Sequence, residues 1–134
     1  MNYWHIQLHP NNRANFPDKR IREILEQKGI IGLGEWEDGE QTRNQFADRM
    51  AIGDIVAVKQ GSTPIALVRV TGNAYFERSV DDNFDWFPNR RDIEVLDFYQ
   101  KEYDFIIPQP RGTLSICDNL NTATSQIIIK WFKM

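Results

Sequence analysis

The sequence lacks the features of several protein classes. Cys117 is its only cysteine, so no internal disulfide can form, and we expect a reducing, cytoplasmic environment. No apolar run approaches the ~18 residues that a membrane-spanning helix needs. The first residues have neither the basic nor the apolar region of a signal peptide. The length of 134 residues is typical of one domain. We therefore expect residues 1–134 to form a single domain, alone or as part of a longer protein.

Positive charge is also scarce. The chain has 16 Lys and Arg against 19 Asp and Glu, a formal net charge of -3. Proteins that coat nucleic acid without specificity depend on Lys and Arg to neutralise phosphates. The charge balance therefore disfavours a general nucleic-acid binder, but it leaves room for a local basic rim around a specific pocket.

Motifs for catalysis and for metal binding are missing. The two histidines, His5 and His9, have no carboxylate or cysteine at ligand spacing, whereas metal sites need three or four ligands. We find no nucleophile elbow, P-loop or dinucleotide-binding glycine pattern. Cys117 follows Ile116 in an apolar segment, where a small buried residue is expected. We predict structural roles for these residues, no metal or cofactor, and no enzyme activity.

The hydrophobic pattern predicts the order strand-helix-strand-helix-strand-strand-strand-helix. The second and third helices begin at a Thr42–Gln45 capping box and near residue 124, although a strand is an alternative for the tail. The first helix is capped by Asn15 or Asp18 and ends at Gly29. Strands are expected at 3–8, 30–33, 54–59, 65–71 and 92–99, with a further short one at 105–107.

The two strands at 54–59 and 65–71 are apolar on both faces, which is typical of central strands. The short turn between them favours antiparallel pairing. The expected fold class is α+β and mostly β: a strongly curved mixed sheet or small barrel with helices packed outside.

Two tryptophans stand in polar surroundings. Trp36 lies between glycines and acids, and Trp86 follows a polar stretch. A flat base taken out of its strand can be sandwiched by two such rings; stacking contributes about 1–3 kcal/mol per base against an unstacking cost of a few kcal/mol. A methyl group on the base adds ~0.8 kcal/mol when buried. The alternative is that each ring covers the end of the barrel as a packing lid.

The order of segments resembles the PUA-like superfamily, in particular its EVE and YTH-like branches. The resemblance is carried by segments 34–36 (Gly-Glu-Trp), 44–46 (Asn-Gln-Phe) and 53–56 (Gly-Asp-Ile-Val). YTH domains bind N6-methyladenine in RNA through an aromatic cage, and related domains read DNA in modification-dependent restriction enzymes of the McrBC type. The resemblance implies a flipped, methylated base, DNA more than RNA, and assembly with motor and nuclease components.

By this resemblance Trp36 and Trp86 form the walls of the cage, and Phe84 or Tyr75 supplies a further wall. Glu37 stands where YTH domains commonly have a small hydroxyl residue. A carboxylate there can accept a hydrogen bond from an exocyclic amine of cytosine or adenine. The candidates for contacts with the nucleic-acid backbone lie near strand ends or loops: Lys59, Arg90, Arg91 and Arg111.

Two other functions remain open from the sequence. One is an RNA-processing or nucleotide-hydrolysing enzyme of the ASCH type on the same fold, in which Lys59 and Glu37 are the pair expected to converge. The other is a protein-interaction domain whose exposed aromatic residues meet a partner. An enzyme makes product, and an interaction domain ignores nucleic acid.

Overall fold

The computed structural model describes residues 1–8, 17–34, 39–108 and 113–134. Its strands are β1 (Tyr3–Gln7), β2 (Ile30–Leu33), β3 (Ile55–Gln60), β4 (Thr63–Val70), β5 (Tyr75–Phe76), β6 (Asn89–Phe98) and β7 (Leu114–Ile116). Its helices are α1 (Asp18–Lys28), α2 (Gly39–Asn44), the π-helix η1 (Gln45–Arg49), the 3₁₀-helix η2 (Lys101–Tyr103) and α3 (Ala123–Phe132). None of the helices in these ranges is long and apolar enough to cross a membrane.

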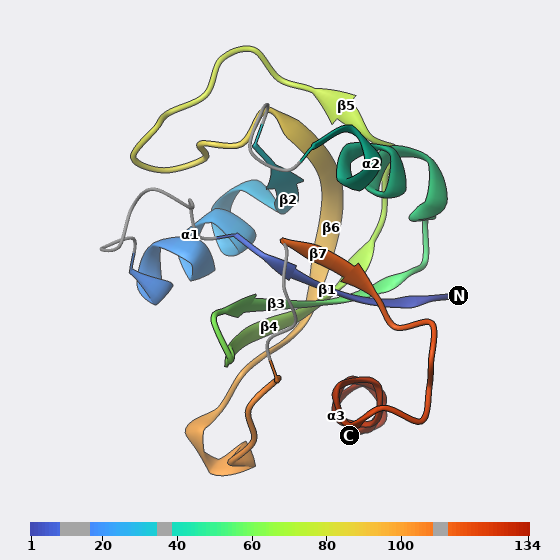
Figure 1. Cartoon of the computed structure of the whole chain (residues 1–134). Helices are drawn as coiled ribbons and strands as arrows, with labels where there is room; N and C mark the ends of the chain where they lie inside the picture. Colours follow the sequence, from blue (N-terminus) through green and yellow to red (C-terminus); the bar gives the residue numbers. More distant parts are fainter. Residues whose placement is uncertain (9–16, 35–38, 109–112) are drawn as a thin grey trace.

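The strands form one curved mixed sheet in the order β2-β6-β4-β3-β1-β7, and β5 pairs with β6 beside this path. β1 runs parallel to β3, with Trp4 opposite Val56. The other pairs are antiparallel, including β3 with β4. β3 and β4 are the buried central strands, as the sequence predicted. Figure 1 shows α1 and α3 on opposite sides of these strands.

The alternation of side chains along the central strands gives each face of the sheet its own core. The main core lies between α1 and the sheet and includes Trp4, Ile6 and Val56. The second core lies under α3 and includes Ile55 and Trp131. Cys117 is buried there, as predicted. Because successive residues on a strand point to opposite faces, each position on β1 and β3 belongs to one core only.

A buried carboxylate fixes the start of β3. Asp54 accepts hydrogen bonds from the indole N–H of Trp4, the backbone N–H of Asn2 and the backbone N–H of Ala51, at 2.9, 2.9 and 3.0 Å. Gly53 precedes it with φ +96°, in the range that favours glycine. The Gly-Asp pair thus joins the start of β1 to the start of β3.

Three local predictions were wrong. The residue before α1 is Pro17, which makes no side-chain cap, and Asp18 is already helical; Asn15 lies outside the described residues. The second helix begins at Gly39, so Thr42 lies inside α2 and does not cap it. Residues 105–107 form no strand, and β7 takes the edge position beside β1 instead. The Gly29 stop and the C-terminal helix are confirmed.

Candidate functional site

The connection between β5 and β6 crosses the C-terminal end of β1 and holds Trp86 there. The Trp86 indole N–H donates to the carbonyl of Leu8 at 2.9 Å. Its ring is half-buried, packs against the main core, and meets Phe87 edge-on with centroids 5.4 Å apart. Trp86 is therefore a partly buried residue with a fixed ring orientation at this end of the sheet.

Phe87, the neighbour of Trp86 in the chain, packs against β2 and so helps to position Trp86. Phe87 is fully buried, and its ring lies so close to Gly32 that a Cβ there would stand 2.1 Å from Phe87 Cδ2. The side-chain amide of Asn89 donates to the carbonyl of Gly34 at 3.2 Å. Trp86 thus contacts the residue after β1, Phe87 packs on β2, and Asn89 at the start of β6 contacts the residue after β2. Gly32 was not among the predicted site residues, because its role depends on an aromatic ring that is distant in the sequence.

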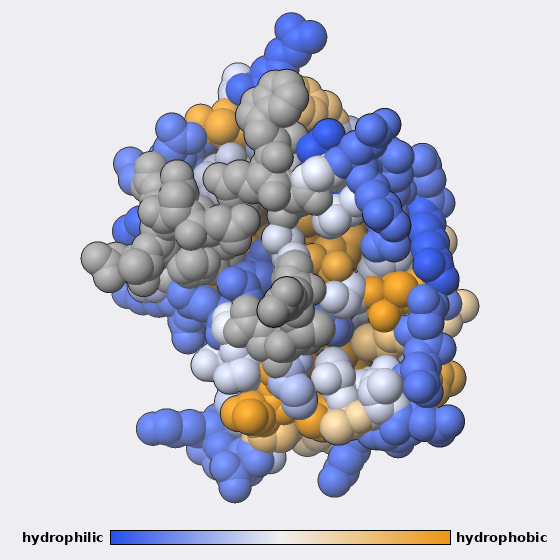
Figure 2. All heavy atoms as spheres, viewed as in Figure 1, coloured by the Kyte–Doolittle hydropathy of each residue, from blue (hydrophilic) through white to orange (hydrophobic). Residues whose placement is uncertain are grey.

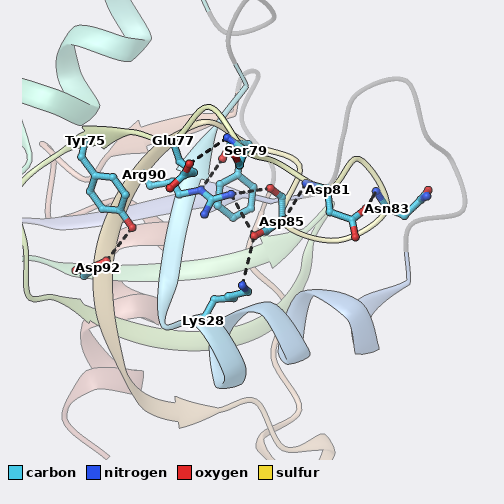
Figure 3. A network of polar contacts seen from close by, with 10 residues as sticks. Lys28, Tyr75, Glu77, Ser79, Asp81, Asn83, Asp85, Arg90 and Asp92 are labelled. Carbon is cyan, nitrogen blue, oxygen red and sulfur yellow. Dashed lines mark hydrogen bonds and ion pairs between the residues drawn. The ribbon is translucent and has the colours of Figure 1, made fainter.

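A polar network gives the connection its shape (Figure 3). The Arg90 guanidinium donates to the carbonyls of Phe87 and Asp85, each at 2.9 Å, and lies 3.2 Å from the Asp85 carboxylate. The Lys28 ammonium approaches the same carboxylate from α1, at 3.9 Å. The backbone N–H of Asp81 donates to Asp85 at 3.0 Å. Arg90 thus holds the residues on either side of Trp86, Asp85 and Phe87, in place.

Arg90 and Arg91 were predicted to contact the nucleic-acid backbone, and the structure places both in the interior. Arg90 is 6% exposed and Arg91 is 2% exposed. Arg91 donates to the carbonyls of Gly72, Phe46 and Met50 at 3.1, 2.9 and 2.6 Å. Burial lowers the pKa of its guanidinium. Both guanidinium groups are used to satisfy backbone carbonyls, so neither is available at the surface for phosphate.

The other predicted aromatic walls do not gather around Trp86. Tyr75 is 41% exposed on β5, and its hydroxyl donates to the Asp92 carboxylate at 3.0 Å. Burial raises the pKa of this hydroxyl, and Asp92 adds to the effect. Phe84 packs against the main core. Among the described residues the ring contact of Trp86 is with Phe87. The predictions for Trp36, Glu37, Arg111 and His9 fall on residues outside the described ranges.

Lys59, another predicted backbone contact, is also buried, at 1% exposed. Its Nζ has no hydrogen-bond partner, and burial lowers its pKa. His5, on the neighbouring strand, is 4% exposed. Burial, and then the charge of Lys59, lower the pKa of His5 from 6.5 to about 4. The structure therefore places Lys59 in the interior of the sheet and not at the surface.

The pKa of His5 makes stability depend on pH. Unfolded His5 binds a proton below its usual pKa of about 6.5, whereas folded His5 stays neutral until about pH 4. Because the unfolded state then binds more protons, stability falls as pH falls between these values. We expect His5 to remove about 2 kcal/mol of unfolding free energy between pH 7 and pH 5.

Urea unfolding of wild type and His5→Gln at both pH values measures this effect. Both proteins have the same carboxylates, so the difference between them isolates His5. The same pH dependence in both proteins would show that His5 is not held neutral by the fold.

Figure 2 shows the hydropathy of one face of the molecule. Where described residues are visible, apolar side chains form separate patches between hydrophilic ones. Single apolar residues on a surface are ordinary, whereas a protein-binding site is usually a continuous patch.

Comparison with known proteins gives a family and a fold. The family model described as "Domain of unknown function (DUF8426)" matches residues 5–105, so the chain belongs to this family. No curated protein matches. The human THYN1 protein, solved in complex with 5-methylcytosine-containing DNA, superposes with a TM-score of 0.56 at 10% identity, over 99% of this chain and 98% of that one.

Two bacterial structures are also similar. A Pseudomonas putida protein has a TM-score of 0.50 at 14% identity, over 98% of this chain and 99% of that one. An Agrobacterium tumefaciens protein, Atu2648, has a TM-score of 0.43 at 19% identity, over 100% of this chain and 80% of that one. At these identities the likeness concerns the fold. The predicted α+β fold, a curved mixed sheet with helices packed outside it, is confirmed.

Proposed function

We propose that this DUF8426 domain binds DNA and holds one base, extruded from its strand, against the exposed part of Trp86, without a catalytic step. The observation that carries the proposal is the placement of Trp86 at the end of β1, where it is only partly buried and its indole N–H is held by the carbonyl of Leu8. The likeness of the whole fold to THYN1, whose structure contains 5-methylcytosine DNA, supports DNA as the ligand.

A preorganised ring suits this task. The hydrogen bond to Leu8 and the edge contact with Phe87 hold the Trp86 ring in one orientation, so little side-chain freedom is lost when a base stacks on it. Stacking on one ring contributes about 1–3 kcal/mol, close to the cost of unstacking a base. A second wall is therefore needed, and we propose Trp36, which follows two residues after the Gly34 that Asn89 holds.

The charges near Trp86 point to recognition of the base more than of the backbone. The connection between β5 and β6 carries more acids than bases: Glu77, Asp81, Asp82 and Asp85 against Arg78. Arg90 and Lys28 neutralise only Asp85 among them. Acids repel phosphate, so affinity gained by counterion release should be small. We expect binding to weaken less with salt than it does for a basic DNA-binding protein.

Fluorescence anisotropy with duplexes that carry one 5-methylcytosine, and with unmodified duplexes, tests the proposal. We expect tighter binding to the modified duplex. Trp86→Ala should weaken it by about 5- to 150-fold, the equivalent of 1–3 kcal/mol, while Trp86→Phe keeps an aromatic face and most of the affinity. Trp131→Phe is the matched control, because it removes an indole N–H from the second core.

Binding by Trp86→Ala that equals wild type would contradict the proposal. The same assay with RNA oligomers, and with oligomers that contain N6-methyladenine, identifies the preferred nucleic acid and the preferred base. The context of a restriction system, with motor and nuclease components, follows from the family resemblance and stays a prediction.

A further inference from the structure

Lys59 differs from the other buried charged groups among the described residues. The side chains of Asp54, Asp85, Arg90 and Arg91 all have hydrogen-bond or ion-pair partners. The Lys59 ammonium is buried to the same degree and has none. An unpaired buried charge is costly, and a methionine of similar length would fill the position without that cost. Buried groups of this kind call for an explanation other than stability.

The neighbours of Lys59 define a small polar cluster at the ends of β1 and β3. Gln7 lies opposite Lys59 in the parallel pair, and His5 lies two residues earlier on the same face. His5 and Lys59 therefore lie on the same face of two neighbouring strands. This face belongs to the second core, whereas Trp86 packs against the main core. The cluster is therefore separate from the proposed base site.

Backbone hydrogen bonds fix the segments next to this cluster. The backbone N–H of Ile107 donates to the carbonyl of Ser62 at 2.9 Å, and the backbone N–H of Gln7 donates to the carbonyl of Thr113 at 2.8 Å. The amide oxygen of Gln7 accepts the backbone N–H of Gly61 at 3.1 Å, which leaves its NH2 group as a donor. Ammonium, imidazole and amide can each donate a hydrogen bond here, and no acid among the described residues pairs with Lys59.

We propose that Lys59, together with His5 and Gln7, binds an oxyanion of the phosphate class. Such a ligand supplies the acceptors and the negative charge that Lys59 lacks, and it forms short charge-assisted hydrogen bonds. Because the amine is buried, the test is made at equilibrium. The proposal goes beyond base recognition and does not depend on it.

Thermal unfolding in sodium phosphate, and in sodium chloride of equal ionic strength, measures the interaction. We expect phosphate to raise the melting temperature of wild type by a few degrees over chloride. Lys59→Met should lose this response. Lys130→Met, which changes an exposed lysine on α3, should keep it. If Lys59 has only a structural role, Lys59→Met should change the melting temperature but keep the phosphate response, and this result would contradict the proposal.

The oxyanion can be a free phosphate or a phosphate of the DNA backbone, and binding to unmodified duplex separates these sources. If Lys59 contacts a backbone phosphate, Lys59→Met should make the dependence of log affinity on log salt less steep by about one. A free oxyanion predicts an unchanged slope with the phosphate response lost. If neither phosphate nor DNA distinguishes Lys59→Met from wild type, the proposal is overturned. The phosphate measurement stands even if the domain binds no DNA.

Discussion

Gly32→Ala should destabilise the protein by about 3 kcal/mol, the upper part of the range for overpacking a core. The new Cβ would lie 2.1 Å from Phe87 Cδ2 and 2.3 Å from the carbonyl oxygen of Asn89. The ring is fully buried, and the carbonyl belongs to the strand that pairs with β2. Either β2 and β6 separate or Phe87 leaves its place.

Urea unfolding gives the size of this loss. Gly72→Ala is the matched control, because its Cβ would come no closer than 3.3 Å to the Asp92 side chain, and we expect a much smaller effect. Since Phe87 supports Trp86, Gly32→Ala should also weaken DNA binding. A Gly32→Ala protein as stable as Gly72→Ala would show that Phe87 does not pack on β2 as described.

Arg91→Met should cost about 3 kcal/mol or more. The change leaves the carbonyls of Phe46, Met50 and Gly72 without the donors that Arg91 supplies. Each buried acceptor without a partner costs about 1–3 kcal/mol. Two of the three carbonyls lie at the start and end of η1, so this helix should loosen first.

Arg91→Lys keeps the charge but not the planar fork that reaches three carbonyls, so an intermediate loss is expected. Arg69→Met on β4 is the control: Arg69 forms an exposed ion pair with Glu94 at 3.1 Å, and such pairs contribute about 0–1 kcal/mol. Equal losses in Arg91→Met and Arg69→Met, measured by chemical unfolding, would contradict the interior role of Arg91.

The sequence predicts most of the fold because local patterns decide it. Apolar runs on both faces mark β3 and β4. In β1 the sequence alternates apolar Trp4 and Ile6 with more polar neighbours. Gly29 ends α1 in the left-handed conformation, as expected of a helix C-cap. β7 was missed because its three residues, Leu114–Ile116, are too few for a pattern. It exists through pairing with β1, which is a long-range interaction.

The candidate site is less predictable for the same reason. Aromatic residues in polar surroundings identified Trp86, and the structure holds it at the end of β1. Arg90 and Arg91 follow a loop and look solvated in the sequence. Their burial depends on carbonyls supplied by segments distant in the chain, such as Phe46 and Gly72. No local signal shows that a strand begins at Asn89 and draws both arginines into the interior.

The most direct test of base binding at Trp86 is the NMR signal of its indole N–H. The chain has four tryptophans, and substitution of each by phenylalanine assigns their resonances. Two serve as internal controls: the indole N–H groups of Trp4 and Trp131 donate to Asp54 and Asp97 in the interior, each at 2.9 Å.

On addition of duplex DNA with one 5-methylcytosine, we expect the Trp86 resonance to shift strongly, because a stacked base changes the ring-current field at the indole. The Trp4 and Trp131 resonances should stay in place. A Trp86 resonance that does not move while anisotropy shows the DNA bound, or a shift confined to Trp131, would contradict the proposed site.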